Sequence, residues 1–125
     1  FDLRIGIVDN NDVPDLFSSI HYTVLPYRDV TQSGVLLTSY FYEKPVIAAN
    51  HYEFKNYILD NFNGYIFNEL NSLSLYKCLK KAIINHSKDY TQIKTNLCNF
   101  KNENFSKNKI IDDYVLMFNK ILIDE

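Results

Sequence analysis

Cysteines, long apolar runs and an excess of basic residues are all missing or scarce in this sequence. Two cysteines, Cys78 and Cys98, are too few for a disulfide scaffold and lack metal-ligating neighbours, so we expect reduced thiols. No apolar run approaches the roughly 20 residues that span a bilayer, and no signal peptide is visible. Thirteen basic against fifteen acidic residues give a net charge of −2, which argues against a nucleic-acid partner, because duplex binding needs a basic face.

The remaining composition is that of one globular domain. The chain has 125 residues, of which 46% are hydrophobic and 22% charged, which is enough to bury a single core. We predict one domain over residues 1–125, closed by a helix over 104–125, in a cytoplasmic protein. The chain begins with Phe1 rather than Met, so we expect a processed product or an excised piece of a longer protein.

Short β-branched segments alternate with helical patterns along the first half of the chain. Strands are predicted at Leu3–Val8, Tyr22–Tyr27, Lys44–Ala49 and Gly64–Phe67. Helices are predicted at Val13–Ser19, Val35–Tyr42 and Glu53–Asp60. We expect the second strand and the second helix to be buried. Such alternation predicts an α/β, Rossmann-like fold, with a parallel sheet covered by helices on both faces.

Two further helices are predicted after residue 71. In the first, Leu73, Leu75, Leu79, Ala82 and Ile83 have the spacing of an inward face. Its outward lysines, Lys77, Lys80 and Lys81, form either a solvated face or a contact for an anionic membrane. The terminal helix has Ser106 as a candidate N-cap. Its apolar stripe consists of Ile110, Ile111, Tyr114, Val115, Phe118 and Ile121, and with Tyr40–Tyr42 it could dock another domain.

The segment "TQSGV", Thr31 to Val35, places small uncharged residues between a strand and a helix. In parallel sheets, ligands bind beyond the carboxyl ends of the strands. The first turn of a helix has unpaired amide groups and about half a positive charge, so a phosphate can bind there when no bulky side chain blocks it. The alternative is that Thr31 or Ser33 is an ordinary N-cap and that Gly34 merely relieves crowding.

A series of motifs in residues 5–68 resembles the carboxy-terminal half of the group-1 glycosyltransferases, which have GT-B architecture. The motifs are Leu16-Phe17, Val24-Leu25-Pro26-Tyr27, Thr31-Gln32-Ser33-Gly34-Val35, Lys44-Pro45-Val46-Ile47-Ala48, Glu53-Phe54 and Asn63-Gly64-Tyr65-Ile66-Phe67. Each motif is weak alone, but six in the family's order and spacing are specific. The helical tail, including "NFSKNKIIDDY", looks like the closing helices of the family.

This resemblance implies that the chain binds a nucleotide-sugar. Thr31, Gln32, Ser33, Gly34 and Val35 would hold the donor diphosphate. The sugar would pass with retention to a glycan or lipid-linked acceptor, in the assembly of a polysaccharide or glycoconjugate. We expect no metal and no cofactor other than the donor, because the helix dipole and basic side chains stabilise the leaving diphosphate in this architecture. Peripheral association with the inner face of a membrane is a further expectation.

The sequence also departs from the family pattern. Val30 and Thr38 stand where many members have glutamates that contact the donor, although Thr38 retains a hydroxyl. Further candidate donor contacts, each with an ordinary structural alternative, are Arg28, Asn50, His51 and Glu53. The resemblance places an amino-terminal domain before residue 1, so we expect the isolated chain to be inactive. A non-catalytic nucleotide-binding or interaction module, derived from a transferase, is the alternative function.

Overall fold

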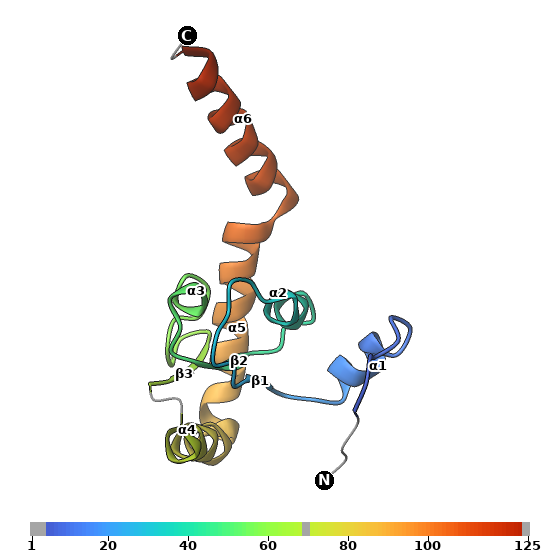
Figure 1. The fold of residues 1–125 in the computed structure, drawn as a ribbon, viewed down its shortest axis with the longest axis vertical. Helices are drawn as coiled ribbons and strands as arrows, with labels where there is room; N and C mark the ends of the chain where they lie inside the picture. The colour runs from blue at the N-terminus through green and yellow to red at the C-terminus, as the bar shows by residue number, and fades with distance from the viewer. Residues whose placement is uncertain (1–4, 69–70, 124–125) are drawn as a thin grey trace.

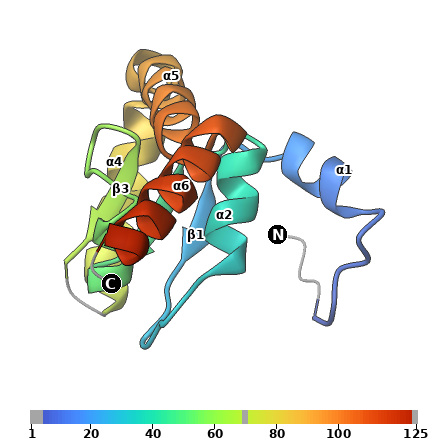
Figure 2. The same ribbon diagram turned by 90° about the horizontal axis from the view of Figure 1, so that it is seen from above.

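The chain folds around a three-stranded parallel sheet (Figures 1 and 2). The computed structural model describes residues 5–68 and 71–123, with side chains described as far as residue 120. Strands β1 (Thr23–Leu25), β2 (Val46–Ala49) and β3 (Gly64–Phe67) are arranged in that order, and Ile47 of β2 lies between Val24 and Tyr65. The α/β, Rossmann-like fold predicted from the alternating pattern is therefore confirmed.

Helices cover both faces of this sheet. In Figure 1, α2 and α3 lie on one side of the strands and α4 lies on the other. The helices described are α1 (Val13–Ser18), α2 (Gly34–Phe41), α3 (Tyr52–Lys55), α4 (Ser72–Ile84), α5 (His86–Phe105) and α6 (Lys107–Ile123).

The core consists of two clusters, one on each face of the sheet. Successive strand residues point to opposite faces, so Ile47 belongs to one cluster and its neighbour Ala48 to the other. The cluster beneath α2 and α3 contains Leu25, Leu36, Tyr40, Val46, Ala48, Phe54, Ile58 and Leu97. The cluster beneath α4 contains Ile47, Ala49, Tyr65, Phe67, Ala82 and Ile93.

Helix α5, which was not predicted from the sequence, lies across the amino-terminal ends of the strands. The His86 ring is 3.3 Å from the hydroxyl of Tyr22, which precedes β1. Lys94 and Lys101 pair with Glu43, which precedes β2, at 3.6 and 3.2 Å. The side chain of Asn96 donates to the carbonyl of Phe62, just before β3. The carboxyl ends of the strands lie at the opposite edge of the sheet.

The first predicted strand, Leu3–Val8, is wrong where it can be checked. Leu3 and Arg4 lie outside the described residues, and residues 5–8 are not in a strand. Ile5 and Ile7 are 91% and 101% exposed. A strand is stabilised by its neighbours in a sheet, and no strand within residues 5–68 or 71–123 pairs with this segment. Its β-branched side chains therefore pack against no strand of the described residues.

Burial of β1 and α2 is lower than predicted. β1 is an edge strand, and its central Val24 is 38% exposed. In α2 only Leu36, Ser39 and Tyr40 are buried, whereas Phe41 is 72% exposed. An apolar helix lying on one face of a sheet can bury only one of its sides.

The predicted helix Glu53–Asp60 is also shorter than expected, since α3 ends at Lys55. In a continued helix the amide of Asn61 would bond to the carbonyl of Tyr57. That amide instead donates to Gly64, and the Tyr57 carbonyl accepts the hydroxyl of Tyr40 and the side-chain amide of Asn63, each at 2.9 Å. These side chains turn the chain toward β3.

The two later helices match their predictions in part. In α4, Ala82 is buried, but Leu73 and Ile83 are 59% and 70% exposed rather than inward. In α6 the Ser106 cap is confirmed, because its hydroxyl accepts from the Lys109 amide at 3.2 Å. α6 projects away from the sheet (Figure 1). Its described stripe residues, Ile110, Ile111, Tyr114, Val115 and Phe118, are 43–58% exposed, while the side chain of Ile121 lies outside the described residues.

Candidate functional site

The first turn of α2 has backbone amides that find no acceptor within residues 5–68 and 71–123. Ser33 has an extended backbone, with φ at −132°, and its hydroxyl accepts from the Leu36 amide at 3.2 Å, so it is an N-cap. The cap pairs one of the amides that a helix leaves unbonded in its first turn. Within the part of the chain that the structure describes, no group accepts a hydrogen bond from the amides of Gly34 and Val35. Capping and anion binding are therefore compatible here.

Crowding does not explain the glycine in this turn. A Cβ atom built on Gly34 meets no atom within 4 Å, and its backbone is not left-handed. The fold therefore tolerates a side chain at position 34. With hydrogen in its place, the backbone of the turn is open to an approaching ligand.

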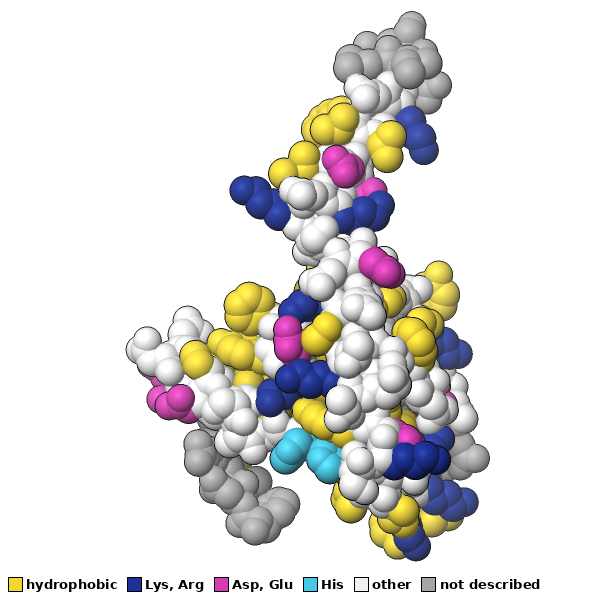
Figure 3. Space-filling view, turned by 180° about the vertical axis from the view of Figure 1, so that it is seen from behind, with side chains coloured by type: hydrophobic (Ala, Val, Ile, Leu, Met, Phe, Trp, Pro, Cys, Tyr) yellow, Lys and Arg dark blue, Asp and Glu magenta, His cyan; other side chains and the backbone are white. Residues whose placement is uncertain are grey.

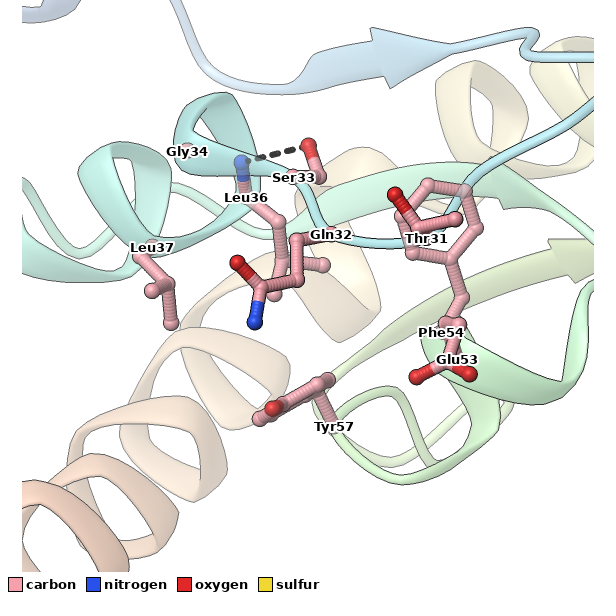
Figure 4. A pocket seen from close by; sticks show the side chains of 9 residues that line it. All are labelled: Thr31, Gln32, Ser33, Gly34, Leu36, Leu37, Glu53, Phe54 and Tyr57. Carbon is pink, nitrogen blue, oxygen red and sulfur yellow. Dashed lines mark hydrogen bonds between the residues drawn. The ribbon is translucent and has the colours of Figure 1, made fainter.

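A pocket of about 250 Å³ lies beside this turn, between the loop after β1 and the segment after β2 (Figure 4). Since both segments follow the carboxyl ends of their strands, the pocket lies at the edge where parallel sheets bind ligands. Figure 4 shows Gln32 extending toward Tyr57, while Glu53 and Phe54 face the pocket from α3. The lining residues are Thr31, Gln32, Ser33, Gly34, Leu36, Leu37, Glu53, Phe54 and Tyr57.

The lining combines a polar rim with an apolar floor. Leu36 and Phe54 are 2% and 1% exposed, so they belong to the core and give the pocket a rigid base. Sequence reasoning did not assign Leu36, Leu37, Phe54 or Tyr57 to the site. No local pattern could have found Phe54 and Tyr57 as a pair, since α3 ends at Lys55 and Tyr57 lies beyond this helix.

His51 links the two loops that form the pocket. Its Nε2 atom is 2.7 Å from the carbonyl oxygen of Tyr27, so the loop after β2 is tied to the loop after β1. Its ring also lies edge-on to Phe54 at 6.1 Å. His51 is not among the lining residues, and these contacts give it a supporting role in the loop geometry.

Asn50 joins the carboxyl ends of β2 and β3. Its amide donates to the Phe67 carbonyl at 3.0 Å, and its side-chain nitrogen donates to Asn68 Oδ1 at 3.0 Å. Its own Oδ1 is buried and has no partner among the described residues. The predicted candidate Asn50 is thus held at the ligand edge without lining the pocket.

Arg28 and Thr38 lie outside the pocket. Arg28 lines a second hollow of about 160 Å³, bounded by the ends of β1 and β3 and the start of α4. The hydroxyl of Thr38 donates to the Gly34 carbonyl at 2.8 Å and thus bonds within its own helix. Val30 packs against the core beneath α2. Of the additional donor contacts predicted, the structure brings only Glu53 together with the Thr31–Val35 turn.

The described residues contain neither a grouped set of metal ligands nor a membrane-spanning helix. In the described ranges, no three side chains of His, Cys, Asp or Glu are grouped closely enough to hold a metal ion. None of the helices described combines the length and apolar character needed to cross a membrane.

The fold resembles solved glycosyltransferase structures. The carboxy-terminal domain of LpcC from Francisella tularensis, a glycosyl transferase group 1 family protein, matches with a TM-score of 0.69 and 21% identity. HepE from Anabaena, solved in complex with UDP, matches with a TM-score of 0.75 and 17% identity. The matches cover 82% and 87% of this chain but only 53% and 30% of those chains. No family profile matches the sequence, and no curated protein is similar enough to match.

These similarities establish the architecture. The chain has the fold of the carboxy-terminal domain of a GT-B glycosyltransferase, as its six sequence motifs predicted. It spans about half of the first of these neighbours and less than a third of the second.

Proposed function

We propose, with this shared fold as the premise, that the chain is the donor-binding part of a glycosyltransferase. It would transfer a sugar from a nucleotide diphosphate sugar to a glycan or lipid-linked acceptor, with retention of anomeric configuration. The observation that carries the proposal is the pair of amides at Gly34 and Val35, which have no acceptor among the described residues and open beside a pocket at the carboxyl edge of the sheet. We place this activity in the cytoplasm, in polysaccharide or glycoconjugate assembly.

The size of the pocket supports a shared site. About 250 Å³ is less than the roughly 300–1,000 Å³ typical of pockets that enclose a small ligand. A nucleotide-sugar would therefore be only partly enclosed by this chain. An amino-terminal domain would supply the other wall and the acceptor, so the chain alone would bind the donor without transferring sugar. HepE, whose fold is similar, was solved with UDP.

The chemistry required of this half is stabilisation of the leaving diphosphate. When the bond between the sugar and the diphosphate breaks, negative charge grows on the phosphate oxygens. The amides of Gly34 and Val35 and the α2 dipole favour that charge without a metal, by about 0.3–2 kcal/mol for the dipole alone. Glu53, on the opposite side of the pocket, is suited to accept hydrogen bonds from sugar hydroxyls.

A non-catalytic nucleotide-binding or interaction module is the second candidate. The observation that favours it is that Val30 is partly buried against the core and the Thr38 hydroxyl is bonded to its own helix. Neither residue supplies the carboxylate that many transferases have at these positions.

Titration of the isolated chain with UDP, GDP and their sugars, followed by amide NMR, tests donor binding. We expect chemical-shift changes centred on Ser33, Gly34 and Val35. The Gly34→Leu variant should remain folded, because position 34 opens onto free space, and should weaken binding at least tenfold. Phe41→Leu, at the far end of α2, is the matched control and should bind normally. Unchanged affinity in Gly34→Leu would refute close approach to this backbone.

Activity separates the two candidates. The chain joined to its amino-terminal domain should release UDP or GDP from the donor that binds. Saturable donor binding without any transfer or hydrolysis in that longer protein would favour the non-catalytic module.

A further inference from the structure

The outer face of α4 carries large apolar side chains that the fold does not need. Leu73, Tyr76, Ile83 and Ile84 are 59%, 57%, 70% and 65% exposed. The opposite face of the helix supplies what the core requires, since Ala82 is buried and Leu75, Cys78 and Leu79 are partly buried against the same cluster. Apolar residues gathered on the solvent side of a helix indicate a contact surface.

Lysines are interleaved with these residues. α4 contains Lys77, Lys80 and Lys81 and no acidic residue, although the whole chain has a net charge of −2. No carboxylate of the described residues forms an ion pair with these lysines. Lys80 lies over the ring of Tyr76 at 5.8 Å, and Lys81 contacts the side chain of Asn61. Figure 3 shows the hydrophobic and basic side chains together at the end of the molecule where α4 lies.

We propose that this outer face of α4 docks the protein onto an anionic lipid surface. Lysine ammonium groups pair with lipid phosphates, while their alkyl stems and the Leu and Ile side chains reach the boundary of the acyl chains. A tyrosine has the amphipathic ring that suits this interface. The combination of basic and apolar side chains on one helix face matches a lipid surface, which offers anionic headgroups above an apolar layer.

Other binding partners would explain either the lysines or the apolar side chains of this face, but not both. A nucleic acid or free phosphate would use the lysines but leave four large apolar residues without a role. A second copy of the chain, paired through the same surface, would bring like charges together, because a two-fold interface places each patch against itself. An anionic bilayer accommodates both kinds of side chain.

Docking through α4 would leave the donor pocket accessible. α4 covers one face of the sheet and α2 and α3 cover the other (Figure 1), so a membrane against α4 lies on the side away from the Thr31–Val35 turn. The proposal does not depend on the chemistry of that pocket and can be tested without a donor.

A single tryptophan can report the contact, because the chain has none. In the Tyr76→Trp variant, vesicles of phosphatidylcholine with 30% phosphatidylglycerol should shift the emission to the blue, and brominated lipid should quench it. Tyr52→Trp, an exposed tyrosine position on α3 on the other side of the sheet, is the control and should show neither effect. Quenching at position 52 but not at 76 would overturn the assignment to α4.

Charge and apolar variants then separate the two contributions in a vesicle sedimentation assay. Lys77→Gln with Lys80→Gln should weaken binding about 25-fold, since each lysine near an anionic surface contributes about fivefold. Leu73→Ser with Ile84→Ser should weaken it at least tenfold. Lys107→Gln with Lys120→Gln on α6 should leave it unchanged. If inorganic phosphate at constant ionic strength displaces the protein from the vesicles, the lysines bind free phosphate and the lipid-surface proposal is refuted. The absence of any binding to the anionic vesicles would refute it as well.

Discussion

The Nε2 atom of His51 lies 2.7 Å from the carbonyl oxygen of Tyr27. Four residues after Tyr27 the chain enters the Thr31–Val35 turn, and one residue after His51 it enters α3. This hydrogen bond therefore fixes the separation of the two segments that form the pocket. Removing a partly buried hydrogen bond of this kind typically costs about 1–2 kcal/mol of stability.

His51→Ala should accordingly lower the free energy of unfolding by about 1–2 kcal/mol, measured in urea. His51→Gln, which retains a donor of similar reach, should lose less than half of that amount. Equal losses in both variants would mean that packing against Phe54, rather than the bond to Tyr27, gives His51 its contribution.

Gly64 and Gly34 should respond in opposite ways to the same substitution. A Cβ atom on Gly64 would lie 2.6 Å from the backbone oxygen of Val46, so β2 and β3 would have to separate. Gly64→Ala should destabilise the protein by about 2 kcal/mol or more. Gly34→Ala enters open space at the start of a helix and should change stability by less than about 1 kcal/mol, in the stabilising direction. Thermal unfolding of the two variants side by side tests this contrast.

Asn63 should be the most sensitive polar position in the described part of the chain. It is fully buried, accepts from the Leu59 amide at 2.8 Å and donates to the Tyr57 carbonyl at 2.9 Å. Asn63→Ala leaves the Leu59 amide unpaired and should cost about 2–4 kcal/mol. Asn104→Ala, which removes an exposed side-chain bond on α5, should stay within about 0.5 kcal/mol. Comparable losses in urea unfolding would contradict this ranking.

Stability should fall in alkali. Burial raises the pKa of the hydroxyls of Tyr40 and Tyr22 above the usual value near 10. The folded state thus keeps protons that the unfolded chain releases, so stability is constant below about pH 10 and decreases as the pH rises toward the folded pKa values. The almost fully buried Tyr40 should contribute a slope of up to about 1.4 kcal/mol per pH unit.

Tyr40→Phe tests that assignment. The variant should be about 1 kcal/mol less stable at neutral pH, because its bond to the Tyr57 carbonyl is lost, but its stability should fall less steeply above pH 10. Chemical denaturation between pH 8 and 11 measures both effects. An unchanged alkaline slope would assign the effect to other tyrosines.

The sequence predicted those elements whose partners are close along the chain. β1, β2, β3 and the start of α2 follow from periodicity and turn residues, and each helix predicted after residue 71 is present. The failures involve distant partners. Residues 5–8 have the composition of a strand but no described neighbour, and α3 ends where Tyr40 and Asn63 take its carbonyl group.

In the candidate site, too, the features set by neighbouring residues were predictable and those set by distant residues were not. The Thr31–Val35 turn was predictable, because a strand, small residues and a helix start occur consecutively. The apolar floor was not, since Phe54 and Tyr57 approach Leu36 only after β2 pairs with β1. The separation of Arg28 from the pocket likewise depends on where α4 begins, which no local pattern reports.

Helix α5 contributes side chains to both core clusters, so the two clusters should unfold together. Ile93 belongs to one core cluster and Leu97, one turn later, to the other. Local unfolding that detaches α5 would expose the core clusters on both faces of the sheet at once. Neither cluster can therefore unfold while the other remains packed. A chain cut before His86 would lose both contributions together, and the remaining residues should collapse without a defined tertiary structure.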